Sequence, residues 1–80
     1  MALFQDSGQD QDRRNEEATT IARRLSGLWK ADQFLIERLD ARSRIFLVDE
    51  LARLSRFGAL RYQSAKMLFW LRDIKEKFDE

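Results

Sequence analysis

Residues 43–58 read SRIFLVDELARLSRFG, and they are the most informative segment about the fold class. The run Ile45–Val48 is apolar on all sides and resembles a strand, but a lone strand has no partner elsewhere in the chain. The Asp-Glu-Leu-Ala-Arg-Leu that follows is strongly compatible with a helix. Gly58 then provides a natural helix stop. We therefore predict a helix that is capped by Ser43 and runs to about Arg56.

The residues before this stretch also predict helices. Apolar residues recur on one side of a helical wheel from about Asn15 to Trp29. Continuing that helix would place Asp32 on its apolar side, so we expect a break there, with Asp32 as the N-cap of a short helix over about Gln33–Ala41. The apolar sides consist of Ala18, Ile21, Ala22, Leu25, Leu28 and Trp29 in the first helix and of Leu35, Ile36 and Leu39 in the second.

After Gly58 the pattern predicts a last and longest helix over about Ala59–Phe78. We assign both tryptophans of the chain to the core. Phe34 and Phe46 lie off the main stripes of their helices, and the sequence leaves open whether they close the core or add to an exposed patch. The inward stripe of the last helix consists of Leu60, Met67, Leu71, Ile74 and Phe78, with Ser64 in the same row and Trp70 at its edge.

The N-terminal end has a different composition. Residues 5–14 are almost wholly polar, and such a stretch buries too little apolar area to offset its ordering entropy. We predict a flexible acidic tail over residues 1–14 and a helical domain over residues 15–80. The predicted fold is all-α, a small bundle of three to four helices with a disordered acidic N-terminal tail. Domains with so small a core are commonly stabilised by oligomerisation.

The composition argues against enzymatic chemistry. The chain of 80 residues has no His and no Cys, which removes the usual catalytic triads and cysteine-containing zinc sites. Its three glycines are isolated, so there is no phosphate-binding loop. The adjacent carboxylates Glu16–Glu17 and Asp49–Glu50 point about 100° apart on a helix, and we interpret both pairs as solvated faces. We expect a non-enzymatic chain without cofactor, metal or small-molecule substrate.

A calcium site in the acidic tail does not fit the sequence. Starting at Asp6, an EF-hand loop would need an oxygen ligand at its third position and a glycine at its sixth. Those positions hold Gly8 and Gln11, so the match fails where the turn must form. The sequence also contains no apolar run near the roughly 20 residues that span a bilayer. We expect a cytoplasmic protein that does not enter a membrane.

The candidate binding surface comes from the last predicted helix. The net charge is −3 over residues 1–17, +6 over residues 18–72 and −2 over residues 73–80. Opposite the apolar stripe, the helical wheel groups aromatic and arginine side chains, which are typical of interaction hot spots. We predict a protein that binds a larger protein or complex, or a second copy of itself, through Arg61, Tyr62, Ala65, Phe69 and Arg72.

Nucleic-acid binding through the Arg-rich segment 38–72 is the alternative prediction. A helix-turn-helix around Gly58 fits poorly, because Leu54 is large where a small residue is usual and Ser64 is polar where an aliphatic one is usual. Aromatic residues beside arginines also suit stacking on single-stranded bases. The candidate phosphate contacts are Arg53, Arg56, Arg61, Lys66 and Arg72.

No residue motif identifies a family. In its small size, its predicted helical fold and its lack of His and Cys, the chain is similar to the small helical regulators and inhibitors that phages and mobile elements encode. This similarity suggests a regulator or inhibitor that acts by occupying a surface of its target.

Overall fold

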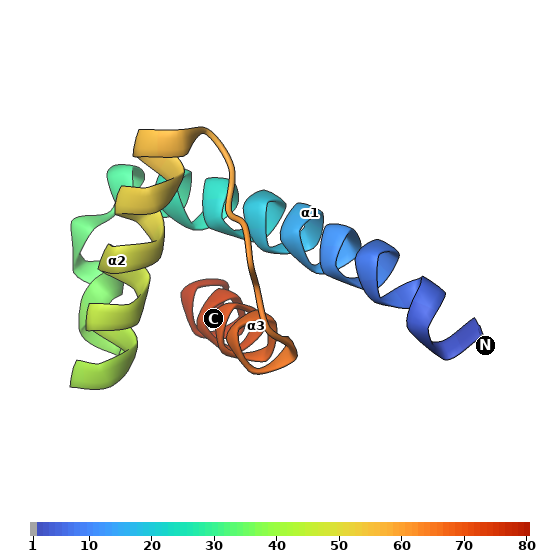
Figure 1. Cartoon of the computed structure of the whole chain (residues 1–80). Helices are drawn as coiled ribbons and strands as arrows, with labels where there is room; N and C mark the ends of the chain where they lie inside the picture. Colours follow the sequence, from blue (N-terminus) through green and yellow to red (C-terminus); the bar gives the residue numbers. More distant parts are fainter. Residues whose placement is uncertain (1) are drawn as a thin grey trace.

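The computed structural model describes the backbone of residues 2–80 and the side chains of residues 10–80. Over these residues the chain is all-α, as predicted, without a strand. Helix α1 spans Ala2–Ala31, the 3-10 helix η1 spans Gln33–Arg38, α2 spans Ala41–Phe57 and α3 spans Ala65–Phe78. In Figure 1, α1 extends well beyond the other helices, which gather around its C-terminal half.

Helix α1 starts earlier than the helix expected from Asn15, and it already includes residues 10–14. Two side chains of this stretch have tertiary partners, since Gln11 and Arg14 both donate to the backbone carbonyl of Gln63. These bonds are formed with a residue about fifty positions away, so local composition did not reveal them. The flexible tail predicted over residues 1–14 is therefore wrong for residues 10–14, and of residues 2–9 only the helical backbone is described.

The core lies between α1, η1, α2 and α3, and most of its members match the predicted stripes. Leu28, Trp29 and Trp70 are half-buried and pack against its edge. Leu68 is a buried member that the predicted stripe omits. The buried hydrophobic residues are Ala18, Ile21, Ala22, Leu25, Leu35, Leu39, Leu47, Leu60, Leu68, Leu71, Ile74 and Phe78.

The predicted break after α1 is confirmed. Asp32 has an extended backbone, and its side chain accepts a hydrogen bond from the backbone N–H of Phe34. The element that follows is a 3-10 helix ending at Arg38, shorter than the helix expected to Ala41. Leu35 is buried within it, whereas Phe34 is exposed.

The predicted cap of α2 is wrong. The N-cap position is held by Asp40, and Ser43 lies inside the helix, where it is buried. Its hydroxyl oxygen accepts a hydrogen bond of 2.8 Å from Trp70 Nε1. The Trp70 ring also stacks on Phe46, with 4.2 Å between ring centroids, so Phe46 closes the core rather than joining an exposed patch.

The predicted start of the last helix is also wrong. Helix α3 begins at Ala65, and Ser64 is its N-cap, accepting a hydrogen bond from the Met67 backbone N–H. The preceding residues form an extended connection that crosses α1 (Figure 1). The helical pattern of the sequence places Ser64 in the inward row of this helix. A serine is favoured at this position because its side chain caps the helix N-terminus.

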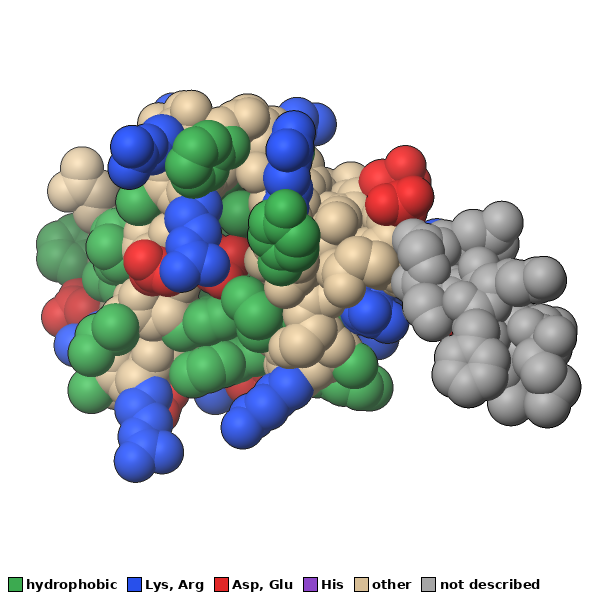
Figure 2. All heavy atoms as spheres, viewed as in Figure 1, with side chains coloured by type: hydrophobic (Ala, Val, Ile, Leu, Met, Phe, Trp, Pro, Cys, Tyr) green, Lys and Arg blue, Asp and Glu red, His purple; other side chains and the backbone are tan. Residues whose placement is uncertain are grey.

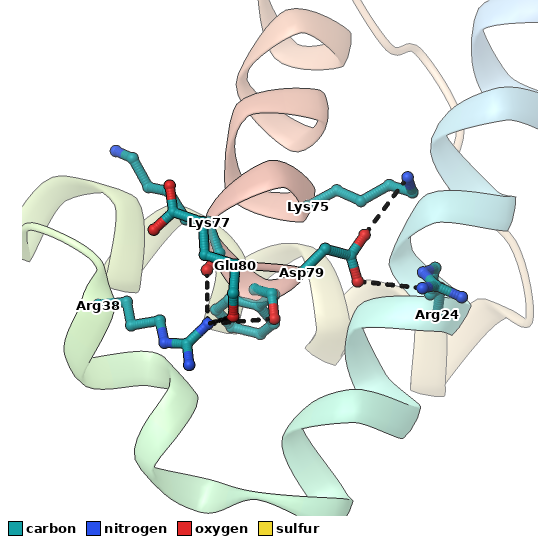
Figure 3. A network of polar contacts seen from close by, with 7 residues as sticks. Arg24, Arg38, Lys75, Lys77, Asp79 and Glu80 are labelled. Carbon is teal, nitrogen blue, oxygen red and sulfur yellow. Dashed lines mark hydrogen bonds and ion pairs between the residues drawn. The ribbon is translucent and has the colours of Figure 1, made fainter.

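The C-terminal end of α3 is held by an arginine of η1. Arg38 Nη1 donates to the backbone oxygens of Lys77, Phe78 and Glu80 at 2.9, 3.3 and 2.9 Å (Figure 3). Lys77 and Phe78 lie in the last turn of α3, whose carbonyls have no intrahelical partners, and Glu80 lies just beyond the helix. Beside them, Arg24 pairs with Asp79 at 3.0 Å.

Candidate functional site

The connection between α2 and α3 is the most unusual part of the backbone. Helix α2 ends at Gly58, which has φ +78° as predicted for a helix stop, and its N–H donates to the Leu54 carbonyl. Two residues later, Leu60 is fully buried, and its N–H donates to Thr19 Oγ1 of α1 at 2.9 Å. The start of the connection is therefore fixed against α1.

Gln63 fixes the other end of the connection to two helices at once. Its backbone N–H donates to Asn15 Oδ1 at 3.0 Å, and its carbonyl accepts from Gln11 and Arg14 at 2.9 Å each. Its side-chain Nε2 donates to Glu50 Oε2 of α2 at 3.2 Å. The sequence gives no sign of this role for Gln63, because a glutamine in a polar stretch carries no signal of burial.

Glu50 is buried, contrary to the expected solvated face for the Asp49–Glu50 pair. Its side chain is 1% exposed. Burial raises the pKa of Glu50, while the hydrogen bond from Gln63 and the charge of Arg53 oppose that shift. Asp49, by contrast, is exposed and pairs with Arg53 at 3.1 Å. The two carboxylates thus differ in environment because only one of them faces the connection.

Tyr62 lies between the two fixed ends and is held in the left-handed backbone region, with φ +57°. That conformation costs a non-glycine residue about 1–2 kcal/mol. Burial of the ring gives no compensation, since Tyr62 is 84% exposed. Residues held in strained backbone conformations cluster at binding and active sites, so Tyr62 is a candidate recognition residue.

Tyr62 borders a hollow with a volume of about 390 Å³, lined by Arg53, Phe57, Ala59, Arg61 and Tyr62. We call it the Tyr62 hollow. Phe57, at the end of α2, is 63% exposed, and the neighbouring Arg56 guanidinium lies 5.3 Å from the centroid of its ring. Figure 2 shows hydrophobic side chains lying among arginine and lysine side chains on this face of the molecule.

The five predicted partner-binding residues separate into two groups. Arg61 and Tyr62 precede α3 and line the Tyr62 hollow. The helical wheel that grouped all five therefore does not apply to these two. Ala65, Phe69 and Arg72 are exposed and lie along one side of α3. Arg72 forms an ion pair with Glu17 of α1, and its guanidinium lies 5.4 Å from the Phe69 ring centroid.

The five residues predicted to contact phosphate belong to α2, to the connection and to α3, and two of them are already paired with carboxylates. Arg53 pairs with Asp49 at 3.1 Å and lies 3.9 Å from Glu50. Arg72 pairs with Glu17, and this hydrogen bond lowers the pKa of Glu17. Among the described residues, Arg56, Arg61 and Lys66 form no ion pair.

Phe57 was not among the predicted site residues. It lines the Tyr62 hollow because it directly precedes the turn at Gly58.

Family models, curated proteins and solved structures give no match to this chain. The candidate site is therefore defined by its own geometry. In the described part of the chain, no helix is both long and apolar enough to cross a bilayer. The same residues bring together no cluster of three or more potential metal ligands.

Proposed function

We propose that this chain is a non-enzymatic interaction protein that binds a larger protein through the Tyr62 hollow. The observation that carries the proposal is Tyr62 itself: an exposed aromatic ring on a strained backbone, between two anchored residues. Leu60 and Gln63 hold that backbone in place through α1. A preorganised aromatic anchor loses little conformational entropy on binding, which favours affinity.

The lining of the hollow suggests the chemistry of the partner. Tyr62 and Phe57 offer apolar and aromatic surface, while Arg61, which forms no ion pair among the described residues, offers a guanidinium group beside it. Arginine pairs with carboxylates through parallel hydrogen bonds, and aromatic rings and arginines are enriched at binding hot spots. We infer a partner surface on which acidic side chains surround a large apolar one.

Nucleic-acid binding is the second candidate, and the geometry supports it less. Phosphate recognition requires guanidinium groups that are available along a common surface. Arg53 and Arg72, two of the five candidate residues, are already paired with carboxylates. We extend the protein-binding proposal to a cytoplasmic regulator or inhibitor, which would act by occupying the surface of its target.

A peptide selection tests the proposed site directly. The whole chain is used to select binders from a random peptide library displayed on phage, and the affinity of the best peptide is then measured by fluorescence polarisation. We expect selected peptides to combine Asp or Glu with a large apolar residue. Tyr62→Gly, which suits the left-handed backbone, should weaken binding by at least about tenfold.

Phe34→Ser is the matched control, since Phe34 is also an exposed aromatic residue but belongs to η1. This variant should bind the selected peptide as the parent does. Equal losses in both variants, or selected peptides that bind Tyr62→Gly at full affinity, would contradict the proposed site.

A further inference from the structure

The outer side of α2 carries a second apolar surface, separate from the core and from the Tyr62 hollow. Its residues follow one another at intervals of four, three, four and three positions, which is the heptad spacing of helices that pair with a second helix. Ile45 is 71% exposed and Val48 is 49% exposed. We call this surface the α2 seam, and it consists of the exposed residues Ala41, Ile45, Val48, Ala52 and Ser55.

Two opposite charges border the α2 seam. Arg44 and Asp49 line a shallow hollow of about 440 Å³ together with three seam residues, Ile45, Val48 and Ala52. Arg44 donates to the backbone carbonyls of Leu39 and Glu37 at 2.8 and 3.3 Å, and Asp49 pairs with Arg53. Both side chains stay exposed, and an arginine with five donors and a carboxylate with several acceptor sites can each form further bonds.

We propose that two copies of this chain pair through the α2 seam, with the two α2 helices parallel and in register. In heptad terms Ile45 and Ala52 occupy a positions, while Ala41, Val48 and Ser55 occupy d positions. Arg44 then occupies a g position and Asp49 the following e position. In a parallel pair these positions face each other across the interface.

Charge complementarity is what favours a second copy over another occupant. Arg44 of one copy faces Asp49 of the other, and the two-fold symmetry of a homodimer repeats this ion pair on the opposite side. The chain thus supplies both members of each pair. The small side chains of Ala41, Ala52 and Ser55 allow the two helix backbones to approach closely.

The parallel arrangement has a consequence for binding. Phe57 ends α2 and lies on a different side of that helix from the seam. A parallel pair therefore places both Tyr62 hollows at the same end of the dimer, where one partner with two suitable surfaces could be bound with avidity. The pairing itself does not depend on the proposed role of the hollow.

Sedimentation equilibrium of the full chain tests whether the dimer forms. We expect a mass that rises with concentration to twice the chain mass of 9.6 kDa. Val48→Asp should remain a monomer while keeping its helix content by circular dichroism, and Phe34→Asp, which lies outside the seam, should still dimerise. A monomeric parent chain up to its solubility limit, or a dimer that Val48→Asp leaves unchanged, would overturn the proposal.

A mixing experiment tests the parallel register. Arg44→Asp and Asp49→Arg each place two like-charge contacts in their own dimer, so each should dissociate about tenfold more readily than the parent. An equal mixture of the two variants restores both opposite-charge contacts in the heterodimer and should associate as the parent does. A mixture that associates no better than either variant alone would overturn the parallel arrangement.

Discussion

The Gln63 side-chain amide donates a hydrogen bond of 3.2 Å to Glu50 Oε2, and both residues are buried, with 1% of each exposed. The other amide atom, Gln63 Oε1, is buried and has no donor among the described residues. A buried carboxylate and an unpartnered carbonyl oxygen both reduce stability. The same contact joins α2 to the connection that carries Tyr62.

The first prediction concerns Glu50→Gln, which should raise the free energy of unfolding at pH 7 by about 1 kcal/mol, because it removes the cost of burying a charge. An amide at this position can also donate to Gln63 Oε1. Urea denaturation followed by circular dichroism measures the change. Glu76→Gln, at an exposed position of α3, is the control and should change stability by less than about 0.5 kcal/mol.

The pH dependence of this effect has a defined sign. Burial raises the pKa of Glu50 above its ordinary value of 4.5. Its contribution to stability is therefore fully present below the unfolded pKa and is lost as the pH rises through the folded pKa. The pKa values of Glu17 and Asp79 are lowered by hydrogen bonds from Arg72 and Arg24, so their contributions are lost as the pH falls.

The difference in stability between Glu50→Gln and the parent therefore isolates Glu50 from these other groups. That difference should grow as the pH increases from about 4.5 toward neutrality. A difference that stays constant over this range would show that Glu50 has the same pKa in the folded and unfolded chain.

The second prediction separates stability from recognition at Tyr62. Tyr62→Gly should stabilise the fold by about 1 kcal/mol, because glycine adopts the left-handed backbone without a steric penalty. Tyr62→Ala keeps the Cβ atom and thus the strain, so it should give no such gain. Urea denaturation of both variants measures the difference. If both variants are destabilised equally, the Tyr62 ring contributes packing that its 84% exposure does not indicate.

The third prediction concerns the arginine that holds the end of α3. Arg38→Ala should lower the free energy of unfolding by about 1–2 kcal/mol, because it removes a cationic donor to several helix-terminal carbonyls. Arg42→Ala is the matched control. Arg42 is exposed and forms no ion pair or hydrogen bond within residues 10–80, so thermal unfolding should change little. Similar melting temperatures for the two variants would argue against the role assigned to Arg38.

The fourth prediction distinguishes the two candidate functions. Fluorescence anisotropy with mixed-sequence duplex and single-stranded DNA should show no binding at physiological salt, since Arg53 and Arg72 are engaged with carboxylates. Weak binding at low salt is compatible with the basic middle of the chain. Binding that persists at physiological salt and falls in Arg61→Gln would favour the nucleic-acid function instead.

The helical class, the break at Asp32, the stop at Gly58 and most of the core could be predicted from the sequence alone. Each of these depends on residues close together in the chain. The apolar stripe from Ala18 to Leu25 has helical spacing, the Asp32 side chain caps a residue two positions away, and Gly58 needs only its own backbone freedom. Local propensity and periodicity are sufficient to predict such features.

The candidate site, in contrast, depends on contacts between residues that are far apart in the sequence. Helical pattern favoured a helix through Tyr62, but contacts of Leu60 with Thr19 and of Gln63 with Asn15, more than forty positions apart in sequence, hold this segment extended. The segment held in this way places the Gln63 side chain against the buried Glu50 and leaves Tyr62 exposed. Hydrogen bonds between distant residues outweigh helix propensity here, because propensity differences amount to less than about 1 kcal/mol per residue.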